Sequence, residues 1–191
     1  MPPKQRFTRE EIIEAALEIT RKEGIDSLTA RRLGAYLNSS SRPIFTVFNS
    51  MNEVISETVT AARELYNKYI EKALSDEKPF KATGQAYIEF AMNEPKLFQL
   101  LFMTENQKIH ELSYVLSAID ENSGMIFDEI RKEYGLDDAK AHLLYQYLWI
   151  FTHGIATLTV TKVCRFEDKE IDGMLTNVCK SILMRIKAGD I

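Results

Sequence analysis

The amino-acid sequence predicts an all-α fold of about nine helices, with a small N-terminal head of three short helices and a larger helical bundle. Apolar residues recur at helical spacing along nearly the whole chain, and no alternating strand pattern persists. The 191 residues include only 8 Gly and 5 Pro, mostly at the edges of these periodic segments. We expect one domain at residues 1–52 and a second at residues 53–191.

The first helix is expected to begin after Thr8 and to end at Gly24. Thr8 and Glu11 have the spacing of a capping box, in which each side chain accepts a hydrogen bond from the other residue's backbone N–H. Phe7 and Ile12 occupy the positions of the accompanying hydrophobic staple. The apolar stripe of this helix consists of Ile12, Ala15, Ala16 and Ile19.

Two further short helices are expected, joined by a tight turn. Thr29 caps the second helix, and Asn38, just after its end, tolerates the left-handed conformation of a turn. The serines at 39–41 supply N-caps for a third helix of barely two turns, Arg42 to Val47. Pro43 lies in the first turn of this helix, where its missing N–H is tolerated.

The remaining helices form the bundle. Ser50 and Glu53 have the spacing of another capping box, which opens a long fourth helix to about Leu74. Pro95 interrupts the next helical stretch, and Gly135 separates two later helices, the second of which Asp137 is expected to cap. The five expected helices after the fourth span residues 79–93, 96–103, 108–134, 138–163 and 168–187.

The net charge of −4 is unevenly distributed. Residues 1–50 hold eight Lys or Arg and six Asp or Glu, which gives +2, and residues 51–191 hold the other 16 and 22, which gives −6. A basic head on an acidic body suits a protein that contacts phosphate groups at one end only.

The head has the arrangement of a helix-turn-helix, whose second short helix enters the major groove of DNA. Base and phosphate recognition there needs hydroxyl groups and a cation, which Ser40, Ser41, Arg42 and Thr46 supply. Thr29, at the positive end of the second helix, is placed to hold a phosphate. The alternative for each of these residues is an ordinary cap or solvent-exposed turn position.

The segment 28–50, LTARRLGAYLNSSSRPIFTVFNS, resembles the DNA-binding motif of the TetR family of bacterial transcriptional repressors. The matching positions are a Thr opening the second helix, an aliphatic–aromatic pair, a later aromatic and a Ser-capped fourth helix: Thr29, Ile44 with Phe45, Phe48 and Ser50. Residues 7–16 and 24–28 also resemble the family, so that the resemblance covers about residues 5–56. It implies a homodimeric repressor that binds double-stranded operator DNA.

The chain departs from the family pattern at four positions. Asn38 stands where the family usually has Gly, and Phe45 where it often has Tyr. Val47 and Met51 replace groups that commonly meet the DNA backbone with apolar side chains. The alternative function is therefore a TetR-like ligand-binding or adaptor protein with weakened DNA recognition. Phe48 is expected in the core, and Phe45 either in the core or against a thymine methyl group.

Two segments of the bundle are similar to regulatory domains of the same family, namely residues 87–102 and the Trp…His-Gly motif at residues 149–154. In that family these elements surround a ligand cavity. The expected cavity residues are Phe90, Phe98, Phe102, Met103, Met125, Tyr145, Trp149 and His153. This mixture suits an apolar or aromatic small-molecule effector, and the alternative is plain core packing.

The last two helices are expected to form the homodimer interface, as the resemblance implies. The helix at 138–163 is apolar nearly all round, which is typical of a helix buried on more than one side. Small residues that would allow a second helix to approach closely are Thr152, Gly154, Ala156 and Thr159. A symmetric dimer also fits a two-fold operator.

Other classes of protein are not indicated. The sequence has no nucleophile elbow, phosphate-binding glycine loop or HExxH motif, so neither an enzyme nor a cofactor is expected. His153 has no Cys, Asp or Glu three or four residues away, so no metal site is expected. Cys164 and Cys179 are expected as small, buried, reduced thiols. Without a long apolar stretch or a secretory segment, we expect a cytoplasmic protein that does not contact membranes.

Overall fold

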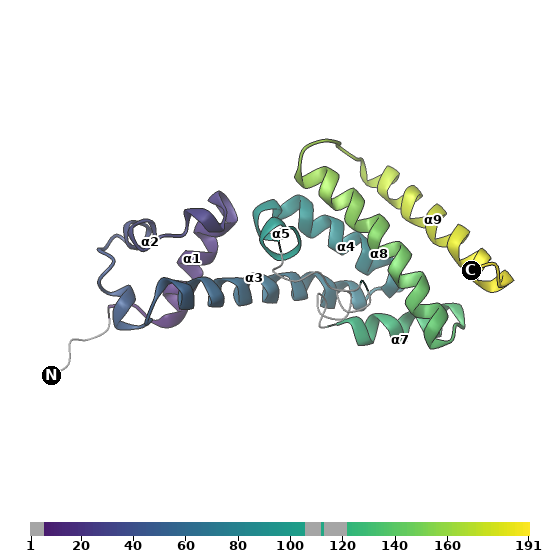
Figure 1. Cartoon of the computed structure of the whole chain (residues 1–191), viewed down its shortest axis with the longest axis horizontal. Coiled ribbons are helices and arrows are strands. Elements are labelled where there is room, and N and C mark those ends of the chain that lie inside the picture. The colour runs from purple at the N-terminus through teal and green to yellow at the C-terminus, as the bar shows by residue number, and fades with distance from the viewer. Residues whose placement is uncertain (1–5, 106–111, 113–121) are drawn as a thin grey trace. The chain divides into compact units, whose positions relative to one another are not determined.

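The computed structural model describes residues 6–105, 112 and 122–191. In these residues the protein contains eight α-helices, two 3₁₀ turns and no strand, which confirms the all-α prediction (Figure 1). The chain forms two compact units, the first with residues 1–65 and 94–104 and the second with residues 66–93 and 105–191. The functional boundary at residues 52 and 53 stays a prediction, since packing and function need not divide a chain at the same residue.

The first unit contains α1 (Arg9–Glu23), α2 (Ala30–Tyr36), the first part of α3 (Met51–Leu74) and α5 (Pro95–Phe102). The predicted capping box at the start of α1 is confirmed, because Thr8 Oγ1 accepts from the Glu11 N–H at 3.2 Å and the Thr8 N–H donates to the Glu11 carboxylate at 2.8 Å. Thr29 caps α2 as predicted, with its Oγ1 accepting from the Arg32 N–H at 3.2 Å. Asn38 has a φ of 50°, which is the predicted left-handed conformation.

The segment after this turn differs from the prediction. The expected helix Arg42–Val47 is a single 3₁₀ turn, η2 (Ile44–Thr46), in which the Thr46 N–H donates to the Pro43 carbonyl at 3.2 Å. A helix of barely two turns gains few backbone hydrogen bonds, and these do not offset the conformational entropy lost in forming it. Pro43 also lacks an N–H, which removes one possible donor. The 3₁₀ geometry is the usual outcome for such short pieces.

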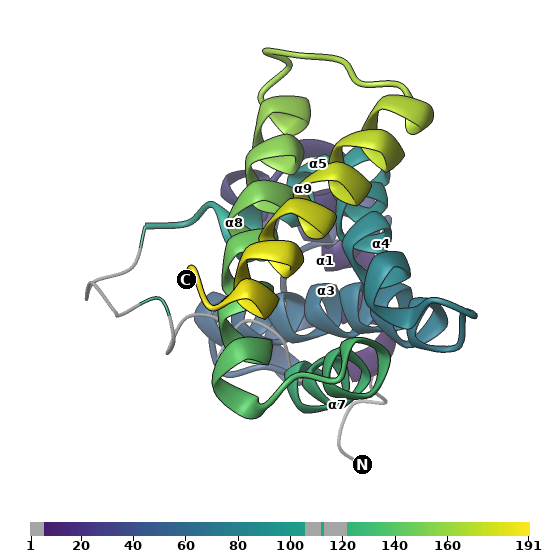
Figure 2. The ribbon, with the colours of Figure 1, turned by 90° about the vertical axis from the view of Figure 1, so that its right-hand side faces the viewer.

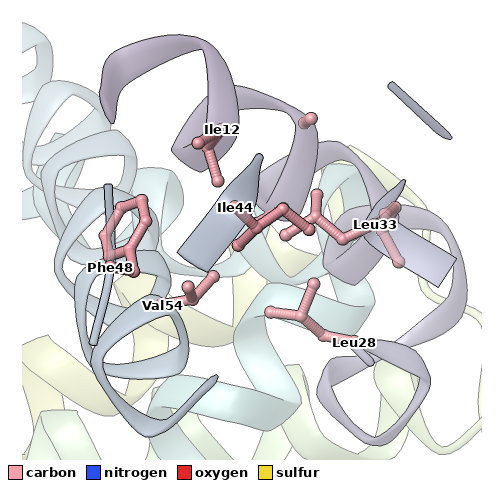
Figure 3. Packing of buried hydrophobic residues seen from close by; sticks show 9 residues of the cluster. Ile12, Leu28, Leu33, Ile44, Phe48 and Val54 are labelled. Carbon is pink, nitrogen blue, oxygen red and sulfur yellow. The ribbon is translucent and has the colours of Figure 1, made fainter. Parts of the chain in front are cut away.

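A hydrophobic core joins α1, α2, η2 and the start of α3 (Figure 3). Its buried members are Ile12, Ala15, Ala16, Ile19, Leu28, Leu33, Ile44, Phe48 and Val54. Phe48 is only 2% exposed, so its predicted core position is confirmed. Burying one aliphatic or aromatic side chain of this size stabilises a fold by about 1.5–3 kcal/mol, so that this cluster is the main source of stability of the first unit.

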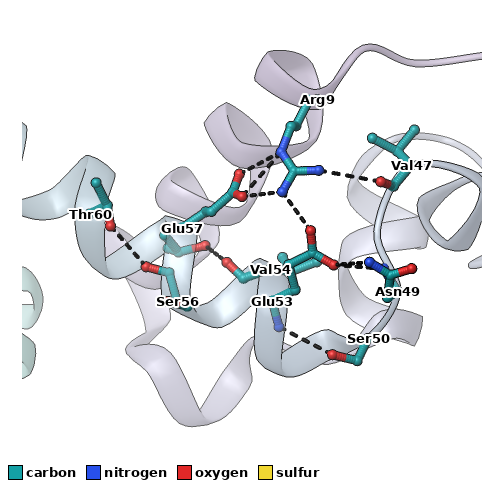
Figure 4. A network of polar contacts seen from close by, with 10 residues as sticks. Arg9, Val47, Asn49, Ser50, Glu53, Val54, Ser56, Glu57 and Thr60 are labelled. Atoms are coloured by element: carbon teal, nitrogen blue, oxygen red, sulfur yellow. Dashed lines mark hydrogen bonds and ion pairs between the residues drawn. The ribbon is translucent and has the colours of Figure 1, made fainter.

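Arg9 connects α1 to α3 at the edge of this core (Figure 4). Its Nε donates to the two Glu57 carboxylate oxygens at 3.1 and 2.9 Å, and one terminal nitrogen donates to Glu53 Oε1 at 2.6 Å. The other terminal nitrogen donates to the Val47 carbonyl at 3.4 Å, and the guanidinium carbon lies 4.3 Å from the centroid of the Phe48 ring. The hydrogen bonds that Arg9 donates to Glu57 and Glu53 raise the pKa of Arg9 above its already high value.

The second predicted capping box is half formed because Glu53 is shared. Ser50 Oγ accepts from the Glu53 N–H at 3.3 Å, as a capping box requires. The Glu53 carboxylate, however, accepts from the Asn49 N–H at 2.8 Å rather than from Ser50, and it also binds Arg9. These hydrogen bonds, led by that from Asn49, lower the pKa of Glu53.

An ion pair between an exposed arginine and a buried carboxylate holds α5 against α1 within the first unit. Glu94, the N-cap residue of α5, is only 2% exposed, and the Arg21 Nε donates to its Oε2 at 2.6 Å. Removing Arg21 would leave the Glu94 carboxylate without its counter-ion in a water-poor site, which is strongly unfavourable. The pair therefore fixes the attachment of α5.

The second unit contains α4 (Pro79–Asn93), α7 (Ser123–Tyr134), α8 (Asp138–Val160) and α9 (Asp168–Ala188). Helix α8 packs against α4, α7 and α9 (Figure 2). The described part of the expected helix 108–134 begins only at Ser123, and residues 108–111 and 113–121 lie outside the described residues. Gly135 has a φ of 65° and the Asp137 carboxylate caps α8, as predicted. None of the helices described is both long and apolar enough to cross a membrane.

Gly34 allows the backbone of the 39–41 turn to approach α2. A Cβ at this position would lie 2.9 Å from the Ser40 carbonyl carbon and 2.9 Å from the Ser41 nitrogen, closer than such atoms can pack. The Gly34 carbonyl also accepts from the Ser39 N–H at 2.9 Å. The placement of the 39–41 turn therefore depends on this glycine.

The substitution Gly34→Ala is expected to destabilise the protein by about 1–3 kcal/mol, because the methyl group must displace backbone and this overpacking outweighs the better helix propensity of Ala. Urea unfolding followed by circular dichroism measures the change. Gly124→Ala in α7 is the matched control, since a Cβ there meets nothing within 4 Å, and it should be neutral or stabilising. A Gly34→Ala protein as stable as the control would contradict the close approach.

Candidate nucleic-acid interface and ligand cavity

The residues expected to contact DNA lie at the surface of the first unit. Of the six, the structure leaves five exposed and one, Ser41, partly buried; the exposed five are Thr29, Ser40, Arg42, Phe45 and Thr46. They lie at the N-terminus of α2 and on the segment around η2. Both places are the ones that a helix-turn-helix uses to contact phosphates and base edges.

The structure shows the surroundings of two of these side chains, Phe45 and Thr46. Phe45 is 46% exposed, so of its two expected positions the core is excluded. Thr46 Oγ1 donates its proton to the Pro43 carbonyl at 2.6 Å. Its hydroxyl oxygen can still accept a hydrogen bond, for example from a base amino group, but donation to a phosphate would require breaking the bond to Pro43.

Two adjacent arginines of α2 have different surroundings. The Arg32 Nε donates to Glu23 at 3.1 Å, and this carboxylate raises the pKa of Arg32. Arg31 is exposed, and no hydrogen bond or ion pair engages its guanidinium in the described part of the chain. Sequence reasoning missed Arg31, although its position two residues after the Thr29 cap could have indicated it.

The two apolar departures from the family pattern have structural roles. Val47 and Met51 are partly buried and pack against the core of the first unit. The backbone carbonyl of Val47 in addition accepts from Arg9. Their side chains therefore contribute to the packing of the head.

The second unit encloses a cavity of about 350 Å³, within the about 300–1,000 Å³ common for small-molecule sites. Its apolar wall comes from five helices, of which α7 supplies Ile126. The second part of α3 supplies Tyr66 and Ile70, and α9 supplies Leu175. The side chains contributed by α4 and α8 include Phe80, Tyr87, Tyr145, Leu148 and Trp149.

The structure brings two of the eight expected cavity residues, Tyr145 and Trp149, to this wall. Phe90 is fully buried between the rings of Tyr66 and Tyr69, each 5.3 Å away between centroids, so it packs in the core of the second unit. Met125 is exposed. The remaining aromatic and methionine residues, Phe98, Phe102 and Met103, belong to the first unit.

His153 lies beside the cavity wall rather than in it. Its ring stacks on Trp149 with centroids 4.9 Å apart and planes 9° from parallel, and its Nδ1 shares a hydrogen bond of 2.9 Å with the Tyr87 hydroxyl. Burial lowers the pKa of His153, which favours the neutral ring. His153 thus orients two wall residues, Tyr87 and Trp149.

Tyr134 and Cys179 form the far part of the wall. The Cys179 thiol lies 4.0 Å from the Tyr134 hydroxyl. Burial raises the pKa of the Cys179 thiol and that of the Tyr134 hydroxyl, so both groups are neutral at physiological pH. Among the described residues no group of three or more His, Cys, Asp or Glu could hold a metal ion.

Sequence reasoning missed most of the cavity wall. Tyr66 and Ile70 occupy i and i+4 positions of α3, and such a pair reads as ordinary core. Phe80, Tyr87 and Leu175 are likewise apolar positions with helical spacing. Periodicity indicates that these residues point inward, but it carries no signal for whether the interior is filled.

Comparison with known proteins places the chain among transcriptional regulators. A family model described as "Tetracyclin repressor-like, C-terminal domain" matches residues 80–180, which is more than half of the 191-residue chain. Among solved structures, the fatty acid degradation regulator FadR from Bacillus halodurans has a similar fold, with a TM-score of 0.53 over 96% of both chains at 16% sequence identity. A search of curated protein sequences finds no match. The family match confirms the resemblance seen in the sequence, and the chain belongs to the TetR (tetracycline repressor-like) family.

Proposed function

We propose that this protein is a dimeric DNA-binding transcriptional regulator, a repressor that an apolar or aromatic small molecule releases from its operator. The observation that carries the proposal is the exposed, unpaired state of Arg31 and Arg42 among the described residues of the head. Unpaired guanidinium groups next to exposed hydroxyls are suited to phosphates and guanine edges. Family membership supports the same function.

Helix α3 provides a route from effector to DNA. It is one continuous helix, whose residues Glu53 and Glu57 bind Arg9 of α1 and whose residues Tyr66 and Ile70 line the cavity. A molecule that fills the cavity and shifts α3 would act on the helix that anchors the head. A coupling free energy of about 1–3 kcal/mol between the two sites is enough to regulate operator binding.

An exposed apolar stripe on α8 supports the dimer. Tyr147, Ile150, Gly154 and Leu158 are all exposed and follow one another at three- and four-residue spacing, so they share one face of the helix. Of the four small residues expected at a helix–helix contact, Thr152 and Ala156 are buried within the chain, Thr159 is partly buried and Gly154 is exposed. We propose that this face pairs with its copy, together with α9, where Met184 is 69% exposed.

The alternative is a TetR-like ligand-binding or adaptor protein without strong DNA recognition. The inward packing of Val47 and Met51 favours it, since neither side chain supplies a phosphate contact. Specific, salt-dependent DNA binding separates the two functions.

Replacing Arg31 or Arg42 by Ala is expected to weaken binding to the DNA upstream of the protein's own coding region by about 1–3 kcal/mol each if the residue reads a base, or to lower the salt slope by about one if it contacts a phosphate. Fluorescence anisotropy with labelled duplex at several salt concentrations measures both effects.

Arg32→Ala is the matched control, because Arg32 is the neighbouring residue and is already bound to Glu23. It should leave operator affinity nearly unchanged. Absence of specific binding by the unmodified protein at any salt concentration would favour the adaptor function.

Gly154→Arg is expected to convert a dimer into a monomer. A Cβ at Gly154 meets nothing within 4 Å, so the substitution fits the single chain, but a charged side chain at a close helix–helix contact cannot be accommodated. Light scattering after gel filtration should shift from twice the chain mass of 22.0 kDa to the chain mass itself. Gly124→Arg, at an exposed glycine of α7 with equally open space, is the control and should remain dimeric. A dimeric Gly154→Arg protein would rule out this face as the interface.

A further inference from the structure

The cavity of the second unit has an electropositive opening. Lys78, Lys81 and Lys180 line it, and of these Lys78 and Lys180 are exposed. A lysine that both lines a cavity and is exposed to solvent stands at the opening, with its aliphatic stem along the apolar wall and its ammonium group toward water. Cations therefore flank the entrance to an otherwise apolar space.

Among the described residues, the carboxylates nearby leave two of these lysines without an ion pair. Lys81 pairs with Asp172 at 2.5 Å, and Asp172 also accepts from Gln85 at 3.0 Å. Glu133 is the one acid among the described lining residues, and it is exposed. In the part of the chain that the structure describes, neither Lys78 nor Lys180 forms an ion pair. The three lysines, counted against Glu133 and the Asp172 partner of Lys81, leave a net charge of +1 at the opening.

The interior takes an apolar body. Tyr66 and Phe80 are buried and present ring surface, and Leu148 and Leu175 add aliphatic surface. Thr176 Oγ1 is a buried hydroxyl oxygen of the lining with no hydrogen-bond partner in the described residues. Charge is thus confined to the opening, while the interior offers apolar contact.

We propose that the effector is an amphipathic acid, with an apolar body inside the cavity and an anionic group bound by Lys78 and Lys180 at its opening. The inference rests on the proposed function, because it assigns a chemical class to the effector of that function. It adds the requirement that the effector carries an anionic group, which the proposed apolar or aromatic effector need not have. The anion lowers the cost of bringing two lysine ammonium groups together beside an apolar surface.

Trp149 allows a direct test, because it is the only tryptophan of the chain and lines the cavity. Its fluorescence is followed while the full-length protein is titrated with decanoate, decan-1-ol or decyltrimethylammonium below their micelle concentrations. Decanoate is expected to bind about three- to tenfold more tightly than decanol at low salt, as two partly exposed ion pairs allow. Salt should weaken decanoate binding and leave decanol binding unchanged, since only the acid forms screened ion pairs.

Variants assign the binding to the named residues. Lys78→Gln with Lys180→Gln should reduce decanoate affinity to that of decanol, while Lys169→Gln, an exposed lysine of α9 outside the lining, should have no effect. Gly84→Leu should weaken both ligands, because a Cβ there points to Leu175 and Thr152 of the wall at 3.9 and 4.0 Å. Thermal unfolding by circular dichroism verifies that each variant is folded.

Three results would overturn the inference: equal binding of acid and alcohol, no effect of the double lysine variant, or no binding of decanoate. Operator binding without any ligand is measured on the same protein preparation. If the protein binds its operator specifically and one of these three results is found, the proposal of an acidic effector is wrong and the proposed regulatory function stands. If the protein does not bind its operator specifically, the proposed function itself is wrong.

Discussion

The interaction on which the head depends is the contact of Arg9 with two carboxylates of α3. Its guanidinium binds Glu53 and Glu57, one helical turn apart, and at the same time covers the Phe48 ring and holds the Val47 carbonyl. One side chain therefore fixes the first helix, the end of the η2 segment and the start of the long helix. A planar guanidinium can satisfy so many directions at once, whereas a lysine ammonium would keep the charge and lose the geometry.

The same helix that Arg9 holds also forms part of the cavity. Helix α3 runs unbroken from Met51 to Leu74, so the cavity residues Tyr66 and Ile70 belong to the same helix as the carboxylates that bind Arg9. A second connection exists along the chain, since Glu94 is the single residue between α4 and α5 and its buried carboxylate is held by Arg21 of α1. The chain thus passes through a single residue from α4, which lines the cavity, to α5, which belongs to the first unit.

Local rules of sequence predicted local structure well. Thr8 with Glu11, Thr29, Asn38 and Asp137 each take the expected conformation, because caps and turns involve residues only a few positions apart. The features that were not predicted depend on distant partners. Arg9 meets residues 44 and 48 positions away, and the role of Gly34 follows only from the approach of the 39–41 turn. For the cavity, helical spacing identified inward-facing residues such as Tyr145 and Trp149. It could not distinguish residues that line the cavity from residues packed in the core, and Phe90, expected in the wall, is packed in the core. The 3₁₀ turn at Ile44–Thr46 was missed because caps indicate where a helix starts and do not fix its hydrogen-bond pattern.

The two cysteines of the chain differ in chemical accessibility. Cys164 is exposed in the connection between α8 and α9, whereas Cys179 is partly buried and its thiol has a raised pKa. Because alkylating reagents attack the thiolate, the native protein should react at Cys164 first. This difference offers a natural attachment point for a fluorophore or spin label, without any engineered cysteine, close to the helices proposed to pair in the dimer. Cys179 would become reactive only when the packing around the cavity loosens, which makes it an internal reporter of local unfolding.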